Sequence, residues 1–253
     1  MAAVVELRSV ELAYPIYSIR AQSLRNAIAN MAVGGKLLRN GQDVIHVRAL
    51  EGINFDLHVG DRLGIVGHNG AGKTTLLKVL AGVYEPDRGH IRVEGRISSM
   101  IDIGFGLDPS MTGRENAMIM GRLRGYSART MIEKIPSIIE FSELGSYIDL
   151  PVKTYSAGMT GRLIFACGTS LDPDILLLDE WISTGDASFH EKAAQRMDDI
   201  LAKSRILVFA THDFPMIKRL CNKLLVLDAG SQVYFGDVSG WNFETFQPLA
   251  PAA

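Results

Sequence analysis

The sequence is poor in cysteine, carries almost no net charge and lacks any long hydrophobic run. Two cysteines, Cys167 and Cys221, occur in 253 residues, and their spacing fits no disulfide framework or metal site. We therefore expect two buried, reduced thiols. A formal net charge of −2 gives no sign of a nucleic-acid-binding surface. No apolar run approaches the ~20 residues of a membrane-spanning helix, and we expect no cleavable signal.

The most informative stretch that the sequence does contain runs from Gly67 to Thr75. It fits the pattern G-x-x-x-x-G-K-[ST] and lies between a short apolar strand and a helical run. Its glycines let the backbone close around phosphates, with Lys73 reaching the β- and γ-phosphates and Thr74 offering its hydroxyl to Mg²⁺. The predicted nucleotide-binding residues are Gly67, His68, Asn69, Gly70, Ala71, Gly72, Lys73, Thr74 and Thr75. The competing interpretation, a glycine-rich turn before a core helix, does not require this order of elements.

Five more positions extend the phosphate-loop prediction. Ser156 and Gly158 precede an amphipathic helix, and Asp179 ends the apolar strand 175–178. Asp179 is expected to hold Mg²⁺, and Glu180 directly after it to polarise the attacking water. His212 follows another apolar strand and is placed to contact the γ-phosphate. Taken singly, they fit a helix N-cap, a solvated strand end and a loop histidine, but their joint order favours the ATP site.

These motifs together resemble the nucleotide-binding subunit of an ATP-binding-cassette (ABC) transporter, from about Val4 to Asp237. The resemblance implies that 155–159 is the family signature, Asp186 the D-loop acid and His212 the switch histidine. It also implies a head-to-tail dimer in which the signature serine of one copy closes over ATP held by the other. Since the chain has one phosphate loop and no internal repeat, we expect a second copy to supply the other half.

Softer signals resemble one branch of that family, the exporters of lipid-linked polysaccharide such as O-antigen, capsule, teichoic acid or galactan. They lie in 98–116, in 14–17 and in 184–189. The glutamine that most of the wider family carries before the signature is absent, because no Gln occurs between Lys73 and Gln195. Asp102 falls in about the right place, either as a substitute metal contact or, more simply, as a solvated turn acid.

The expected fold is α/β, a P-loop NTPase domain of the ABC type spanning residues 1–253, with an antiparallel β subdomain and a helical subdomain at about 113–160. Alternating residues at 5–8 and 53–57 predict the half-exposed antiparallel sheet. Continuous apolar runs predict buried strands at 63–66, 175–179, 206–210 and 224–227. From Gly113 to about Leu144 the pattern is helical, with a break or kink expected at Pro136.

The segment 15–48 is expected to be a basic amphipathic insertion. Leu24, Ile28, Met31 and Ala32 recur at helical spacing, which suits either a helix near the membrane or one packed on the sheet. Tyr14, with Tyr17 as the fallback, is expected to stack on adenine, as the family resemblance implies, against the alternative of an ordinary strand aromatic.

The sequence thus predicts an ATPase subunit, with ATP and Mg²⁺ as ligands, that drives polysaccharide export. We expect it to lie at the cytoplasmic side of the inner membrane, on a separate polytopic transmembrane subunit, and not to bind nucleic acid. The alternatives are a soluble ABC ATPase that remodels a ribosome or nucleic acid, and a phosphate-loop kinase, which would leave 155–159 without a role.

Overall fold

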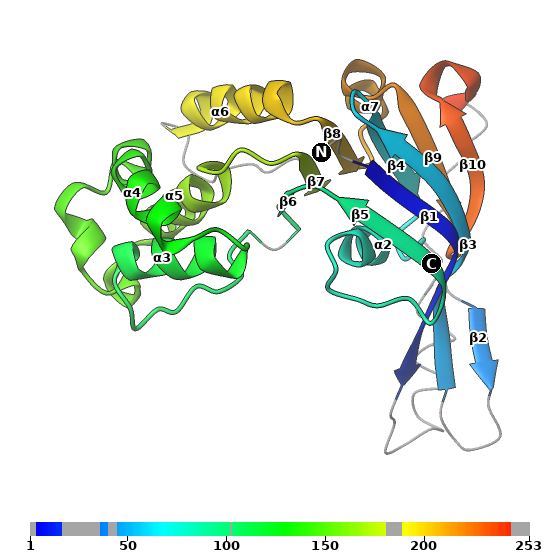
Figure 1. Ribbon diagram of the computed structural model, residues 1–253, viewed down its shortest axis with the longest axis horizontal. Helices are drawn as coiled ribbons and strands as arrows, with labels where there is room; N and C mark the ends of the chain where they lie inside the picture. Colours follow the sequence, from blue (N-terminus) through cyan, green and yellow to red (C-terminus); the bar gives the residue numbers. More distant parts are fainter. Residues whose placement is uncertain (1–3, 17–35, 40–44, 102, 181–188, 244–253) are drawn as a thin grey trace, which may run out of the picture. The chain divides into compact units, whose positions relative to one another are not determined.

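The computed structural model describes residues 4–16, 36–39, 45–101, 103–180 and 189–243 (Figure 1). The chain divides into two compact units. The first unit comprises Met1–Gly95, Leu177–Glu180 and Arg205–Ala253, and the second unit comprises Arg96–Leu176 and Trp181–Ser204.

Three antiparallel strands form one part of the first unit: β1 (Val4–Ile16), β3 (Ile45–His58) and β5 (Arg88–Glu94). β1 pairs with β3 on one side and with β5 on the other. Alternate side chains enter the core, because successive side chains of a strand point to opposite faces. The buried ones are Val5, Leu7, Val10 and Leu12 of β1 and Leu50, Ile53, Phe55 and Leu57 of β3, with the alternation shifted where the β1–β3 register changes between Leu7 and Val10. The alternating pattern therefore predicted parts of β1 and β3 correctly, whereas β5 was not predicted.

β1 and β3 run further than the sequence suggested. Their pairing continues to Ile16 opposite Ile45, and β2 (Lys36–Arg39) adds to β3 (Figure 1). The two ends of the segment 15–48 are thus strand, which corrects the expectation that an insertion interrupts the sheet after Tyr14. The β-branched residues at these ends favour an extended, paired backbone. The predicted apolar face formed by Leu24, Ile28, Met31 and Ala32 lies outside the described residues.

The other part of the first unit is a sheet in the order β10-β9-β4-β8-β7, in which β4, β7, β8 and β9 are mostly buried and β10 is partly exposed. Their bounds are β4 (Arg62–Gly67), β7 (Ile175–Asp179), β8 (Ile206–Ala210), β9 (Lys223–Asp228) and β10 (Ser231–Asp237). β4 pairs in parallel with both β8 and β9. Helix α2 (Lys73–Leu80) follows β4, helix α7 (Phe214–Leu220) follows β8, and the short η4 (Val238–Gly240) follows β10. The predicted buried strands are confirmed, and their carboxyl ends meet at one edge.

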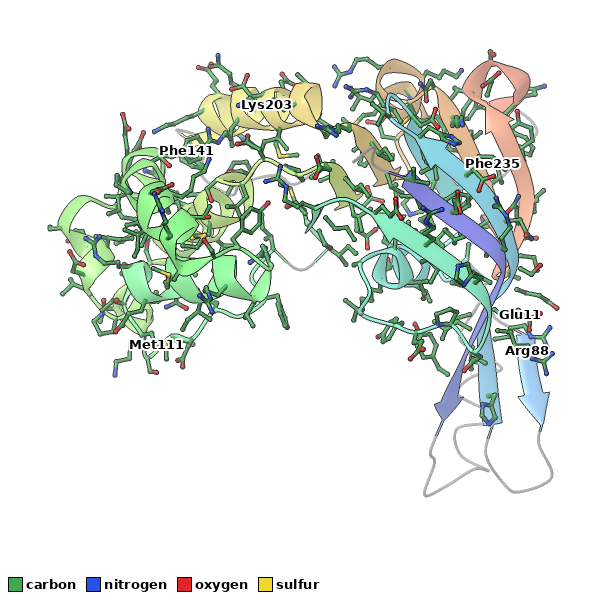
Figure 2. The ribbon with its side chains drawn as sticks, in the orientation of Figure 1. Glu11, Arg88, Met111, Phe141, Lys203 and Phe235 are labelled. Carbon is green, nitrogen blue, oxygen red and sulfur yellow. The ribbon has the colours of Figure 1, made fainter. Side chains whose placement is uncertain are left out.

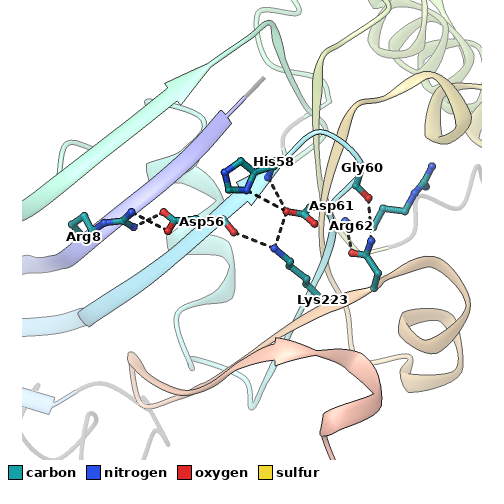
Figure 3. A network of polar contacts seen from close by, with 8 residues as sticks. Arg8, Asp56, His58, Gly60, Asp61, Arg62 and Lys223 are labelled. Atoms are coloured by element: carbon teal, nitrogen blue, oxygen red, sulfur yellow. Dashed lines mark hydrogen bonds and ion pairs between the residues drawn. The ribbon is translucent and has the colours of Figure 1, made fainter. Parts of the chain in front are cut away.

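A polar network ties the strands together at the opposite, amino-terminal end (Figure 3). Asp61 accepts hydrogen bonds from the backbone N–H of His58 at 2.7 Å and from Nζ of Lys223 at 2.8 Å. Asn222 accepts the backbone N–H of Arg62 at 2.8 Å. Because these contacts join the β3–β4 turn to the start of β9, they hold β4 and β9 in the register that places the loop after β4.

The second unit is mainly helical. Its elements are β6 (Ile97–Ser99), α3 (Gly113–Leu123), α4 (Ala128–Ser142), η1 (Gly145–Asp149), η2 (Val152–Thr154), α5 (Ala157–Thr169) and α6 (His190–Lys203). Met120, Met131, Ile138 and Leu163 pack together in its core. The helical pattern beginning at Gly113 is confirmed by α3 and α4.

Of the break or kink expected at Pro136, the break does not occur there. α4 runs through Pro136, while the interruption falls at 124–127, between α3 and α4. Gly125, with φ of +83°, adopts the left-handed conformation that commonly follows the end of a helix. Ser127 then starts α4 as its N-cap by accepting the backbone N–H of Thr130 at 3.1 Å. Tertiary packing has overridden the local signal of the proline.

Aromatic rings and opposite charges hold α6 within the second unit. Phe141 of α4, labelled in Figure 2, contacts Phe189 with ring centroids 5.3 Å apart, and Phe165 of α5 completes the cluster. Lys192 of α6 and Arg162 of α5 both pair with the carboxylate of Glu143, at 2.7 and 3.0 Å. The start of α6 is thereby fixed to α4 and α5.

Both cysteines are buried and free, which confirms the expectation of buried thiols. Burial raises the pKa of the Cys167 thiol to about 12, and it raises the pKa of Cys221 to about 12 as well. Among the described residues no helix is both long and apolar enough to span a membrane.

Candidate functional site

The loop from Gly67 to Thr75 joins buried strand β4 to helix α2. Gly70 and Gly72 have φ of +79° and +103°, values that residues with a side chain rarely adopt. A Cβ at Gly72 would also come within 2.7 Å of the carbonyl oxygen of Ala49. A backbone hydrogen bond also restrains the loop: the N–H of Gly230 donates to the carbonyl of Ala71 at 3.1 Å. Such a loop at a helix N-terminus presents backbone N–H groups to an anion.

Lys73 is the first residue of α2, and it is nearly buried. Its Nζ donates to the carbonyl oxygens of Gly67 at 2.8 Å and His68 at 3.1 Å, and it lies 3.4 Å from Nε2 of His212. Burial lowers the pKa of Lys73, while the nearby carboxylates of Glu180 and Asp179 act in the opposite direction. These contacts hold the ammonium group of Lys73 beside the loop, where the phosphates of a nucleotide would bind.

Thr74 and Asp179 bring two oxygen ligands together. Oγ1 of Thr74 donates to Oδ2 of Asp179 at 2.6 Å, which joins the start of α2 to the end of β7. Mg²⁺ prefers hard oxygen ligands and usually takes only one or two from protein, with phosphates and waters completing its shell. The hydroxyl and the carboxylate therefore fit a Mg²⁺ ion bound together with a nucleotide.

Glu180 has a strained backbone at the end of β7. Its φ is +65°, a left-handed value that costs energy for a residue with a side chain and tends to mark functional sites. Its backbone N–H donates to the carbonyl of Ala210, at the end of β8, at 2.8 Å. Oε2 accepts the hydroxyl of Thr211 at 3.0 Å, and Oε1 lies 3.7 Å from Nε2 of His212. The carboxylate is thus held beside the histidine at the carboxyl end of the sheet.

These groups line one cavity of about 500 Å³, a volume within the usual range of ~300–1,000 Å³ for small-molecule sites. Its lining consists of Tyr14, Val47, Ala49, Asn69, Gly70, Gly72, Lys73, Thr74, Thr75, Asp179, Glu180 and His212. Nearly all the first-unit residues that the sequence singled out are therefore brought together. Val47 and Ala49 of β3 were missed, because they are ordinary apolar residues and only the strand pairing brings them here.

Tyr14 lines the cavity close to Thr75, in the first turn of α2. Its hydroxyl is 3.4 Å from Oγ1 of Thr75, and its ring meets the ring of Tyr84 edge-on at 5.4 Å. Partial burial raises the pKa of the Tyr14 phenol. Tyr14 therefore lines the cavity as the adenine hypothesis requires, whereas Tyr17 lies outside the described residues.

The predicted signature residues belong to the second unit. Oγ of Ser156 accepts the backbone N–H of Met159 at 3.2 Å and so caps α5, which matches its structural interpretation. Gly158 is exposed, and a Cβ there would find no neighbour closer than 3.9 Å. Asp186 and Asp102 lie outside the described residues.

Comparison with known proteins adds three findings. Residues 50–183 match the sequence family described as ABC transporter. The O-antigen export system ATP-binding protein RfbE of Yersinia enterocolitica is 48% identical over 88% of this chain and 93% of its own length. The O-antigen export system ATP-binding protein RfbB of Myxococcus xanthus is 41% identical over 76% of this chain but only 44% of its own length.

Among solved structures, a dimeric ATP-binding cassette in a post-hydrolysis state, bound to ADP and Pi, is similar to this chain with a TM-score of 0.64. The similarity covers 94% of this chain and 100% of that one, at 18% identity. At that identity the likeness concerns the fold alone. The predicted α/β P-loop fold of the ABC type is confirmed.

Proposed function

Because this chain belongs to the ABC transporter family, we propose that it is the ATP-binding and ATP-hydrolysing subunit of an exporter of lipid-linked polysaccharide. The cargo is supported by 48% identity to a protein named for O-antigen export, and the aligned region is nearly the whole of both chains. The sequence stretch 98–116, which resembles the same branch, supports it independently of the phosphate loop. The relatives described above are exporters, and nothing in the site favours remodelling of a ribosome or nucleic acid.

The single observation that carries the ATPase proposal is the meeting of Lys73, Thr74, Asp179, Glu180 and His212 at one cavity. Each group has a distinct task there. Lys73 would neutralise charge on the β- and γ-phosphates, and Thr74 with Asp179 would hold Mg²⁺. When bound, Mg²⁺ supplies charge neutralisation at the phosphate oxygens. Tyr14 would contribute an aromatic face to the base.

The chemical step would use Glu180 as the base. Its carboxylate takes a proton from water as the water oxygen bonds to the γ-phosphorus, and the bond from that phosphorus to the β–γ bridging oxygen breaks to leave ADP. His212 would donate a hydrogen bond to the γ-phosphate, a role supported by its position beside Glu180 and 3.4 Å from Nζ of Lys73. The two side chains thus serve opposite sides of the reaction: one receives a proton and the other stabilises charge.

The functional assembly would contain a second copy of the chain and a separate membrane-spanning subunit. Support for the second copy comes from Ser156 and Gly158, which are exposed. Within the described part of the chain, the Ser156 side chain bonds only to the first turn of its own helix. A head-to-tail dimer would let them close over ATP held by the partner, together with Asp186. The chain would then lie peripherally on the cytoplasmic side of the inner membrane, where ATP is available.

Complementation in the source cell tests the cargo. Deletion of the gene should leave lipid-linked polysaccharide inside the cell, and the wild-type chain should restore it to the surface. The Lys73→Ala variant should not restore it, although it should be made in equal amount. Co-purification of the chain with a polytopic membrane protein should accompany restoration. Normal surface polysaccharide in the deletion strain, or co-sedimentation of the chain with ribosomes instead of membranes, would refute the proposal.

A further inference from the structure

We propose that Thr211 is a positioning residue that orients the carboxylate of Glu180 for attack by water. The inference deepens the proposed ATPase function and rests on it. Thr211 itself would touch neither water nor phosphate. Its role would be to hold one carboxylate oxygen so that the other is presented to the cavity.

Thr211 is rigidly placed. It directly follows β8, its side chain is buried with 1% exposure, and its backbone N–H donates to the carbonyl of Ile65 in the neighbouring strand β4 at 3.3 Å. A buried side chain on a strand end loses most of its rotamer freedom to packing. Its hydroxyl is therefore a fixed point at the edge where the site residues emerge.

The hydroxyl proton of Thr211 is directed at Glu180. Oγ1 of Thr211 accepts the backbone N–H of Asp213 at 3.2 Å and lies 3.0 Å from Oε2 of Glu180. A hydroxyl has one proton, and a carboxylate can only accept. The Thr211 hydroxyl must therefore donate its proton to the Glu180 carboxylate, while a lone pair of the same oxygen accepts the N–H of Asp213. The bond has a defined direction, from threonine to glutamate.

Glu180 needs such a support. Its side chain is 52% exposed, so without a partner its carboxylate would sample several rotamers. Two contacts to the end of β8 restrain it: the backbone N–H of Glu180 to the carbonyl of Ala210, and its Oε2 to Thr211. With Oε2 held, Oε1 faces His212 at 3.7 Å on the cavity side. That leaves one oxygen in a fixed position to receive the proton from water.

Steady-state hydrolysis by the full-length chain, measured as phosphate release against Mg-ATP concentration, tests the proposal. Thr211→Val keeps the shape but removes the hydroxyl, and should lower kcat about tenfold with KM within about twofold, since a hydrogen bond to a charged group is lost while phosphate ligands remain. Thr211→Ser keeps the hydroxyl and should retain at least half of kcat. Thr169→Val, which removes another buried threonine hydroxyl, is the matched control and should leave kcat unchanged.

A second measurement separates positioning from a folding defect. In the Glu180→Gln background, Thr211→Val should cause little further loss of turnover, because residues that act through one group are not additive. Thr211→Cys replaces the hydroxyl by a weaker donor, so its kcat should lie between those of the serine and valine variants. It replaces the valine variant in the comparison if that variant unfolds at a lower temperature than wild type. Equal losses in the serine and valine variants, or an undiminished tenfold loss in the Gln background, would overturn the inference. Full activity of Glu180→Gln would instead overturn the proposed catalytic role of Glu180.

Discussion

The cavity of the first unit and the signature segment of the second unit differ in how completely one chain builds them. In the cavity, the groups that would meet ATP contact one another: Lys73 approaches His212, and Thr74 bonds Asp179. In the signature segment, the Ser156 side chain bonds only to the first turn of its own helix, and a Cβ on Gly158 would meet nothing closer than 3.9 Å, as far as the described residues show. The first region already has the geometry of a phosphate site. The second has the geometry of a helix start whose further task needs another surface.

The difference shows how secondary structure concentrates functional groups. Parallel strands end at a common edge, so Gly67 at the end of β4, Asp179 at the end of β7 and Thr211 directly after β8 lie near one another whatever their distance in sequence. At the N-terminus of α5, by contrast, the Ser156 side chain bonds to a residue three positions later in the same helix. The following experiments test whether the two regions are unequal in function as they are in structure.

Lys73→Ala should have the largest effect. It removes the buried charge that faces the phosphates, so turnover should fall to background and ATP affinity by about tenfold or more. Calorimetry with ATP and phosphate release measure the two quantities. Lys78→Ala, in the same helix, removes a lysine that lies over the Tyr84 ring and should leave both unchanged. Normal binding by the Lys73 variant would mean that the loop is only a structural turn.

Glu180→Gln should separate hydrolysis from binding within the cavity. Turnover should fall by about 10²-fold or more, because the base is lost while Thr74 and Asp179 remain to hold Mg²⁺. The ATP-bound dimer should accumulate, and size-exclusion chromatography with ATP detects it. Asp179→Asn provides the contrast, since it should weaken Mg-ATP binding itself. A monomer in the presence of ATP would contradict the dimer model.

Ser156→Ala should test whether the second region acts on the site at all. Losing the N-cap costs about 1 kcal/mol of stability, and the same cost is expected for Ser127→Ala, the N-cap of α4. Thermal unfolding should therefore show two equal shifts. Only Ser156→Ala should also lower turnover, because only Ser156 would contact ATP in a partner. Equal turnover in the Ser156→Ala and Ser127→Ala variants would mean that Ser156 serves only as the N-cap of α5.

Glu115→Gln should have the smallest effect and concerns stability alone. Hydrogen bonds from the backbone N–H and the hydroxyl of Thr112 lower the pKa of Glu115. Because the pKa of Glu115 is depressed in the folded state, the ionised carboxylate adds to the free energy of unfolding above the ordinary glutamate pKa of about 4.3. That stabilisation is lost as the pH falls through the folded pKa. Melting curves between neutral and acid pH should therefore converge for wild type and variant at the acid end. A constant difference would assign the stabilisation to something other than charge.

The pattern of the sequence was sufficient for the buried strands β4, β7, β8 and β9 and for the phosphate loop. Continuous apolar runs identified β4, β8 and β9, since only buried strands tolerate such runs, and glycine spacing identified the loop. The helix break predicted at Pro136 was wrong, because the packing of α4 outweighed the local preference of one residue. The ends of 15–48 also misled: the pairing of Ile16 with Ile45 joins residues far apart in sequence, and no local signal encodes such a partner.

The sequence by itself determined the kind of chemistry: a phosphate loop with its lysine, two acids after an apolar strand and a histidine after another. The tertiary structure decided which groups touch. It placed Val47 and Ala49 in the cavity, gave Glu180 its left-handed backbone and set the hydroxyl of Thr211 against the Glu180 carboxylate. The physical reason is that residue types and spacing specify which interactions are available, whereas hydrogen bonds and cavities depend on distances between strands that only folding fixes.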